Sequence, residues 1–379
     1  MIKKKILYLE NVASINAVNF YKTAAMAAQE CGMEFHVAYN AADQSEEKIR
    51  ALYQDLGVYF HQVDFVRNPF HPLNYRAYKQ VCQLIKKVKI DFIHCNTPIG
   101  GVIGRLAGKK CKVKKVIYQA HGFHFYKGAP LKNWILYYPV ERWLAHYTDA
   151  IITINTEDYN LAKEKLHLKN NGGKYYVPGV GIDEEVYRHP SIDRDSMRQT
   201  MDVQKKEILL ISVGRLDENK NNEIIIRALA QTSDIKLVIC GDGEQMKYLR
   251  QLSEQLGISN RVLFLGNRND IVNLYHAADV FVMMSFREGL SRSVMEAMAA
   301  GLPCIVSDIR GNRDLIIQNK NGILCSPTDV TCLSANMKKL AKNSTLRENM
   351  AHANVECLKN YSTKSVIKKM IEIYQTIEL

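Results

Sequence analysis

The chain has 379 residues, 47% of them hydrophobic, which is too long for one ordinary domain and sufficient for two sizeable cores. Its formal net charge of +12 is unevenly distributed, because residues 1–190 carry +9 and residues 191–379 carry +3. Such a bias suits nucleic acid, an anionic membrane surface or a phosphorylated ligand, and charge alone does not choose among them.

Composition argues against a secreted or membrane-spanning protein. The first apolar stretch ends at Glu10, too early for a signal peptide, and no run approaches the roughly 18 apolar residues of a membrane helix. The nine cysteines are scattered without a C-x-x-C pair, which favours reduced thiols in a cytosolic protein and predicts no metal site.

In the N-terminal half, short apolar runs alternate with helical stretches. Strands are predicted over residues 6–9, 35–38, 91–95, 115–119, 150–154 and 175–177. Helices are predicted over 21–29 and 46–56, and a loop over 10–16. This alternation predicts a parallel sheet with helices on both faces.

The pattern breaks at 178–183, a polar stretch reaches Lys206, and the alternation then restarts. Strands are predicted over 208–213, 236–240, 262–265, 280–284 and 303–306, and only helices over 331–379. We therefore predict a second parallel α/β domain, with the boundary at about 180–205.

The segment 285–301 is the most informative in the chain. A loop containing Glu288 follows the strand 280–284, and a helix predicted over 291–300 is stopped by Gly301 and Pro303. Free backbone N–H groups at a helix start favour an anion. Glu296 follows Glu288 by a little over two turns, so both carboxylates can face one cleft. The segment predicts a site for a ligand with phosphate and hydroxyl groups.

The loop 213–221 follows the first strand of the second domain. Ligands of open α/β sheets bind beyond the carboxyl ends of the strands, so this loop is expected at the cleft. Arg215 offers a planar fork and Lys220 a point charge, a combination that suits a diphosphate. A solvated turn with surface charges is the alternative.

Two further motifs are ambiguous by themselves. Gly241-Asp242-Gly243-Glu244 has part of a dinucleotide fingerprint but lacks the third glycine, which favours a plain βα turn. His121 follows a strand of the first domain and is either a cleft residue or only a turn residue.

The segment 105–147 combines positive charge with aromatic residues. Six basic residues lie between Arg105 and Lys115, and both tryptophans lie between 134 and 143. Such a combination suits an interfacial patch on an anionic bilayer. A solvated charge run beside a buried aromatic helix is the alternative.

Several motifs of the second half form a set. They are Val213-Gly214-Arg215-Leu216, Lys220-Asn221, Gly241-Asp242-Gly243-Glu244, residues 264–271, Ala278-Asp279-Val280-Phe281, the pair Glu288 and Glu296, and residues 301–306. This set resembles the retaining glycosyltransferases of family 4, which have the GT-B architecture. The first-half segments 94–98, 119–125 and 177–183 are similar to the subgroup that builds bacterial capsule or exopolysaccharide repeat units.

The resemblance implies two Rossmann-like α/β domains that face each other across a cleft. The acceptor-side domain would span 1–185 and the nucleotide-sugar domain 186–379, with the last helix (about 362–377) packing back on the first. The residues implied to bind the donor are Gly214, Arg215, Lys220, Asn267, Arg268, Glu288, Gly289, Leu290, Ser291 and Glu296.

The resemblance also implies individual roles. Arg215 and Lys220 would neutralise the donor diphosphate, and Glu288 would bind the hydroxyls of the transferred sugar. Glu296 would bind the ribose, and His121 would lie against the donor sugar. Backbone N–H groups of Gly289 to Ser291 would hold phosphate, and Asn267 with Arg268 would lie near the base.

The loop 10–16 departs from the family pattern. Family members often carry a glycine-rich loop there, whereas this chain has none, so Ser14 or Asn16 is expected to contact the acceptor by side-chain hydrogen bonds. Enzymes of the family use neither a metal nor a cofactor, and the departing phosphate oxygen is proposed to deprotonate the acceptor.

The sequence therefore predicts a peripheral enzyme at the inner face of the cytoplasmic membrane. It would transfer a sugar with retention from a nucleotide donor, UDP-linked in our prediction, to a polyprenyl-diphosphate-linked saccharide, and would not bind nucleic acid. Two alternatives are a GT-B-like UDP-sugar 2-epimerase and a non-enzymatic nucleotide-sugar or nucleic-acid binder.

Overall fold

A computed structural model of the chain describes residues 3–12, 18–41 and 56–378. The described residues form two compact units, one from those within 1–181 and 363–378 and the other from residues 182–362. The sequence had placed the division between 185 and 186. Both units are parallel α/β structures, which confirms the predicted fold class.

The first unit contains a seven-stranded parallel sheet with the order β3-β2-β1-β4-β5-β6-β7. Its strands are β1 (Lys5–Val12), β2 (Glu34–Asn40), β3 (Tyr59–Gln62), β4 (Phe92–Asn96), β5 (Lys115–Ala120), β6 (Ala150–Thr153) and β7 (Gly173–Tyr176). Its helices are α1 (Val18–Glu30), α3 (Leu73–Val88), α4 (Pro98–Cys111), α5 (Leu131–Ala145), α6 (Thr156–Lys165) and α16 (Thr363–Glu378).

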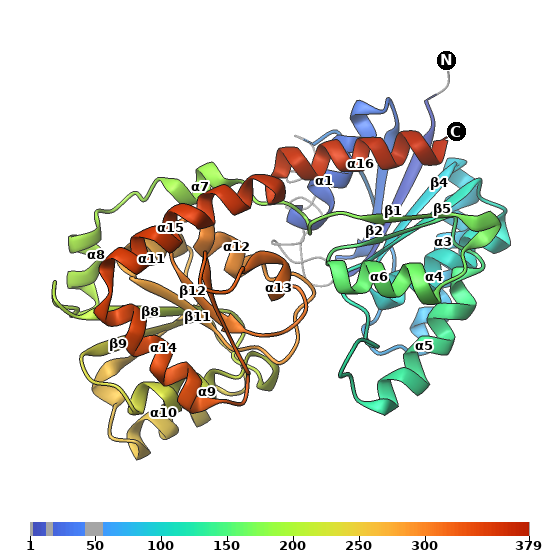
Figure 1. The fold of residues 1–379 in the computed structure, drawn as a ribbon. Helices are drawn as coiled ribbons and strands as arrows, with labels where there is room; N and C mark the ends of the chain where they lie inside the picture. Colours follow the sequence, from blue (N-terminus) through green and yellow to red (C-terminus); the bar gives the residue numbers. More distant parts are fainter. Residues whose placement is uncertain (1–2, 13–17, 42–55, 379) are drawn as a thin grey trace. The chain divides into compact units, whose positions relative to one another are not determined.

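Side chains that alternate along β1 enter different cores on the two faces of this sheet. Ile6 and Tyr8 pack with α1 and α16, whereas Leu7 and Leu9 pack with α3 and α4. The last helix, α16, lies beside α1 in Figure 1 and buries an amphipathic stripe that includes Met370. The C-terminal helix therefore completes the core of the first unit.

The second unit contains a six-stranded parallel sheet with the order β10-β9-β8-β11-β12-β13. Its strands are β8 (Ile208–Val213), β9 (Ile235–Cys240), β10 (Val262–Gly266), β11 (Val280–Met283), β12 (Cys304–Ser307) and β13 (Gly322–Cys325). Its helices are α7 (Glu184–Arg188), α8 (Arg194–Thr200), α9 (Asn222–Ala230), α10 (Met246–Gln255), α11 (Ile271–Ala277), α12 (Arg292–Ala299), α13 (Asn312–Leu315), α14 (Val330–Lys342) and α15 (Ser344–Leu358).

The strands of the second unit are nearly continuous apolar runs because helices cover both faces of the sheet. This composition made them easy to predict, and all five predicted strands are present. The sequence missed β13, whose four residues begin with a glycine, and in the first unit it missed β3, a partly exposed edge strand.

One predicted loop is wrong at its start. The loop predicted over 10–16 begins too early, because β1 continues through Val12. The remainder of that loop, including Ser14 and Asn16, lies outside the described residues, as does almost all of the helix predicted over 46–56.

Candidate active site

Glycines hold the loop after β8 against its neighbour after β9. Gly241 has a φ of 137°, and a Cβ placed there would lie 1.8 Å from the carbonyl oxygen of Gly214. A Cβ on Gly243 would lie 2.3 Å from the carbonyl oxygen of Leu216. The motif at 241–244 therefore supports the loop 214–220 by close backbone packing, for which only glycine leaves room.

Asparagine side chains join the loop after β8 to the loop after β11. The 3₁₀ turn η3 (Glu218–Lys220) includes Asn219, whose side chain donates to the carbonyl of Arg287 at 3.0 Å, and whose own carbonyl accepts from the N–H of Phe286 at 2.8 Å. Asn221 donates to the carbonyls of Met284 and Pro327. These bonds fix the two loops side by side, and sequence reasoning had missed them.

The tethered loops bring together Lys220 and Glu288. The Lys220 Nζ lies 2.7 Å from Glu288 Oε1, and the two side chains are 21% and 15% exposed. An ammonium group has three donors and this contact uses one, so the others can still bind phosphate oxygens. Glu288 likewise keeps lone pairs for sugar hydroxyls.

Arg215 lies on the same loop but is paired separately. Its guanidinium donates to Glu244 at 3.1 Å and lies 3.9 Å from the Asp217 carboxylate, and its side chain is 62% exposed. From the sequence, Arg215 and Lys220 are predicted to bind a diphosphate together. In the structure Lys220 pairs with Glu288, whereas Arg215 lies beside Glu244 and Asp217.

The segment before α12 contains the backbone N–H groups that the sequence predicts to hold phosphate. Ser291 is the N-cap residue of α12, and its side chain makes no capping hydrogen bond but contacts Met283 Sδ at 3.3 Å. Gly289 packs against Gly311, where a Cβ would lie 2.3 Å from the Gly289 carbonyl oxygen. The buried Ser291 side chain and this close packing fix the path of residues 289–291, with Leu290 half-buried between them.

The second predicted carboxylate, Glu296, is tightly surrounded by donors. Tyr187 Oη and Arg292 Nε both reach its Oε1, at 2.8 and 2.9 Å, and Tyr275 Oη reaches its Oε2 at 3.2 Å. Burial and the neighbouring carboxylate raise the pKa of Tyr187 to about 12, so this phenol keeps its proton and remains a donor. Arg292 could have been found from its i,i+4 spacing to Glu296, whereas Tyr187 comes from the distant α7.

The two residues predicted near the base lie after β10. Asn267 is exposed, and Arg268 forms a two-pronged ion pair with Asp270, with distances of 2.8 and 2.6 Å. Both members of this ion pair lie on the loop between β10 and α11.

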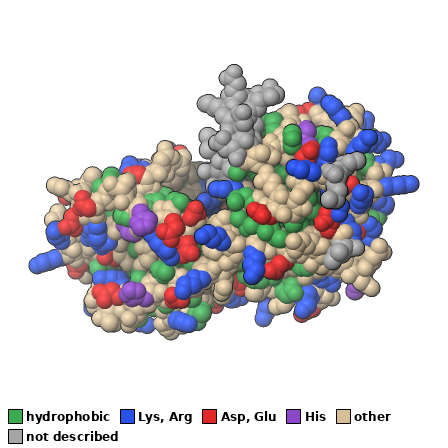
Figure 2. All heavy atoms as spheres, turned by 90° about the horizontal axis from the view of Figure 1, so that it is seen from above, with side chains coloured by type: hydrophobic (Ala, Val, Ile, Leu, Met, Phe, Trp, Pro, Cys, Tyr) green, Lys and Arg blue, Asp and Glu red, His purple; other side chains and the backbone are tan. Residues whose placement is uncertain are grey.

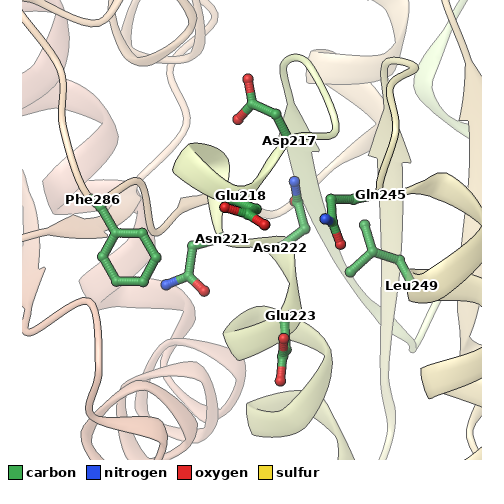
Figure 3. A pocket seen from close by; sticks show the side chains of 8 residues that line it. All are labelled: Asp217, Glu218, Asn221, Asn222, Glu223, Gln245, Leu249 and Phe286. Carbon is green, nitrogen blue, oxygen red and sulfur yellow. The ribbon is translucent and has the colours of Figure 1, made fainter.

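A cavity of about 340 Å³ lies beside η3 and the start of α9. Figure 3 shows Phe286 on one side of it and the carboxylates of Asp217, Glu218 and Glu223 along it. Its full lining is Asp217, Glu218, Asn221, Asn222, Glu223, Gln245, Leu249 and Phe286. Because this lining is acidic and excludes Lys220 and Glu288, the cavity does not suit a diphosphate.

In the first unit, His121 directly follows β5 and is half-buried. Burial lowers the pKa of its imidazole to about 4, so the ring is neutral at physiological pH. A neutral ring can donate or accept a hydrogen bond but brings no charge to a ligand.

The basic segment of the first unit divides into a structural and a surface part. Arg105 is buried, ion-paired with Glu141 and stacked 3.9 Å above the Tyr118 ring, so its predicted place in a surface patch is wrong. Lys109, Lys110, Lys112 and Lys114 are exposed. Figure 2 shows Lys and Arg side chains over much of the face of this unit that it presents.

The helix α5 exposes an unusual number of large apolar side chains. They are Leu131, Ile135, Leu136, Tyr137, Val140 and Trp143, between 41% and 74% exposed. Within residues 3–12, 18–41 and 56–378, no helix has both the length and the apolar character needed to cross a membrane. The same residues contain no cluster of three His, Cys, Asp or Glu side chains arranged for a metal ion.

Comparison with known families and proteins identifies relatives of both units. The family "Glycosyl transferases group 1" matches residues 193–356, and "Glycosyl transferase 4-like" matches residues 5–155. EpsD of Bacillus subtilis (strain 168), which is named as a glycosyltransferase, is 36% identical over 354 residues, 91% of this chain and 90% of EpsD. An Escherichia coli UDP-Gal:alpha-D-GlcNAc-diphosphoundecaprenol alpha-1,3-galactosyltransferase is 31% identical over 256 residues, 65% of each chain.

Solved structures share the whole fold. HepE from Anabaena, crystallised with UDP and glucose, has a TM-score of 0.81 at 20% identity, covering 98% of this chain and 100% of HepE. The sucrose-phosphate synthase of Thermosynechococcus elongatus has a TM-score of 0.82 at 16% identity, covering 99% of both chains. At such identities the similarity establishes the architecture and not the substrate.

Proposed function

Because the chain belongs to the glycosyltransferases of the GT-B fold, we propose that it transfers a hexose with retention to a lipid-linked saccharide. The donor is a UDP-sugar, and the product enters a capsule, an exopolysaccharide or an O-antigen. In support, EpsD covers nearly the whole chain, the Escherichia coli relative uses UDP-galactose and a diphosphoundecaprenol-linked acceptor, and HepE was crystallised with UDP.

The observation that carries this proposal is the contact of Lys220 with Glu288. When the bond between sugar and diphosphate breaks, negative charge grows on the departing phosphate. The remaining donors of Lys220, together with the backbone N–H groups at the start of α12, stabilise that charge. Glu288 accepts hydrogen bonds from hydroxyls of the transferred sugar, which holds the sugar beside the same charge.

Glu296 has a separate role in the proposal. Its three donors fix the position of both carboxylate oxygens, and the lone pairs that remain accept hydrogen bonds from the ribose hydroxyls. The departing phosphate oxygen removes the proton of the acceptor hydroxyl, so that no protein base is needed. Lys220 and Arg215 supply the positive charge, and the reaction proceeds without a metal ion.

We place the enzyme at the inner face of the cytoplasmic membrane, with α5 as the contacting element. The exposed Leu131, Ile135, Leu136 and Trp143 offer an apolar surface of the kind that enters the headgroup region. The exposed lysines between 109 and 114 add attraction to anionic lipids. A polyprenyl-linked acceptor is confined to that surface, so the proposed substrate and location agree.

A screen of nucleotide sugars tests the function. A UDP-sugar donor should raise the unfolding temperature and be slowly hydrolysed, and with an alkyl-diphosphate-linked N-acetylglucosamine the sugar should appear on the acceptor with its anomeric configuration retained. EDTA should leave the rate unchanged. Interconversion of UDP-sugars without acceptor would indicate a 2-epimerase instead, and nucleic-acid affinity with a steep salt dependence and no donor binding would indicate a binding protein.

Vesicle sedimentation tests the location. The protein should sediment with phosphatidylglycerol-containing vesicles at low salt and less with phosphatidylcholine alone. Replacing Ile135 and Leu136 together by serine should weaken sedimentation, whereas Val186→Ser, at an apolar position 54% exposed on α7, should not. If the wild type and both variants sediment equally, α5 is not the element that contacts the membrane.

A further inference from the structure

Glu10 is among the last three residues of β1, which ends at Val12, near the edge of the sheet where open α/β sheets bind ligands. In the first unit β1 is flanked by β2 on one side and β4 on the other, so the strand order reverses between β1 and β4. Ligands bind outside the carboxyl ends of the strands at such a switch point. Leu9 pairs with Cys95, which places Glu10 beside Asn96, the last residue of β4.

The backbone is irregular at this position. Leu9 pairs with Ala38 of β2, and Val12 pairs with Asn40, so β1 contains one extra residue between these two pairs. Such a β-bulge turns a side chain away from its regular direction and is frequent beside active sites. The irregularity includes Glu10.

The carboxyl group of Glu10 is buried, and one of its two oxygens is unpaired among the described residues. Its side chain is 7% exposed, and among the described residues no group hydrogen bonds its Oε2. The neighbouring Asn11 Oδ1, in contrast, accepts from Thr97 Oγ1 at 2.9 Å and from the Gly100 N–H at 2.8 Å. Leaving a buried acceptor unpaired costs about 1–3 kcal/mol. A ligand that bonds Oε2 would recover this cost.

We propose that Glu10 binds a hydroxyl group of the acceptor saccharide. The proposal rests on the transferase function above, in which Lys220, Glu288 and Glu296 of the second unit bind the donor. Burial raises the pKa of Glu10 to about 8, so the carboxyl mostly keeps its proton at pH 7. A protonated carboxyl both donates and accepts, which matches a sugar hydroxyl, whereas an ionised phosphate oxygen only accepts and offers no donor in return.

Tyr8 interacts electrostatically with Glu10 and with Tyr374, and His94 contacts Tyr8 and interacts with His121. None of these four groups changes charge near pH 8. Burial raises the pKa values of Tyr8 and Tyr374 well above the ordinary value for tyrosine, and it lowers those of His94 and His121 to about 3 and about 4. A change in acceptor binding between pH 7 and 9 therefore reports Glu10. As the pH rises through 8 the carboxyl loses its proton and its donor, so the acceptor KM should rise.

The experiment compares Glu10→Leu, Glu10→Gln and the control Glu372→Leu, at an exposed glutamate on α16 of the same unit. The acceptor is an alkyl-diphosphate-linked N-acetylglucosamine, and the donor is the UDP-sugar found by the screen. Glu10→Leu should raise the acceptor KM about tenfold or more, because it removes one hydrogen bond to the acceptor. The donor KM should be unchanged. The acceptor KM of Glu10→Gln should stay close to the wild-type value at pH 7, and it should not rise toward pH 9.

The possible results separate a failure of the Glu10 assignment from a failure of the proposed transferase function. If the wild type transfers sugar and Glu10→Leu has an unchanged acceptor KM, the assignment of Glu10 is wrong while the transferase function stands. If Glu10→Leu does not fold, a rise of KM toward pH 9 that is identical in the wild type and Glu10→Gln overturns the assignment. If the wild type transfers no sugar from any nucleotide donor, the proposed function fails and the role of Glu10 fails with it.

Discussion

The contact between Lys220 and Glu288 gives the sharpest test of the site, because stability and catalysis respond to it differently. The perturbations are Lys220→Met, Glu288→Gln and the double variant. The Met side chain keeps most of the apolar stem of Lys220, and Gln keeps the shape of Glu288, so that charge is the main property removed.

The stability effect follows from burial. Two unit charges about 4 Å apart attract by about 4 kcal/mol at an effective dielectric constant of about 20. An exposed ion pair contributes less than about 1 kcal/mol to the free energy of unfolding, while breaking a fully buried pair lowers it by about 3–5 kcal/mol. Since these side chains are 21% and 15% exposed, we expect each single variant to lose about 2 kcal/mol. The double variant should lose less than the sum, because it leaves no unpaired charge.

The catalytic effect should not show this compensation. In the proposed function Lys220 stabilises the departing phosphate and Glu288 holds the sugar, so losing either group should lower kcat about 10²–10³-fold, and the double variant restores neither group. Urea unfolding gives the stabilities, and product formation from the identified UDP-sugar gives the rates. The control is Lys359→Met, which breaks an exposed pair with Glu356 in the same unit and should change both quantities little.

The assignment would be refuted if Lys220→Met and Glu288→Gln matched Lys359→Met in both stability and rate. A double variant that recovered activity as well as stability would show that the pair is structural only. Normal rates with a loss of stability would lead to the same conclusion.

Two further predictions concern the groups that support the site. Tyr187→Phe removes one of three donors to Glu296, so the Kd for UDP, measured by calorimetry, should rise about 3–10-fold with little change in fold, and an unchanged Kd would argue against ribose binding there. Gly241→Ala places a Cβ 1.8 Å from the Gly214 carbonyl oxygen, so urea unfolding should show a loss of about 3 kcal/mol or more. Gly257→Ala, with a φ of 67° and no atom within 4 Å of its Cβ, should lose only about 1 kcal/mol.

The fold was predictable because its strands are buried on both faces. A run such as 208–213 has few polar positions and stands out from the amphipathic helices around it. The strand β3 could not be found in this way, since it lies at the edge of its sheet and two of its four residues are exposed. Periodicity identifies a strand only where packing requires it to be apolar.

The site was predictable in its charged residues but not in the bonds that position them. Resemblance singled out Lys220 and Glu288 separately, 68 positions apart, and the structure brings them into contact. The hydrogen bonds that join Asn219 to the loop after β11 use backbone groups. Every residue has such groups, so these bonds cannot be predicted from the residue types. Tyr187 was missed for a different reason, because its approach to Glu296 depends on how α7 folds onto α12.

The separate pairing of the two cations suggests how a diphosphate would enter. Arg215 is 62% exposed, and a surface pair with Glu244 contributes little, so a phosphate can take the place of that carboxylate at small cost. Lys220 is mostly buried against Glu288 and would keep this contact while its remaining donors bind the ligand. Salt should therefore weaken donor binding mainly through Arg215, because an exposed charge is screened more than a buried one. On this argument Arg215→Gln should flatten the salt dependence of the donor Kd, whereas Lys220→Met should weaken binding at every salt concentration.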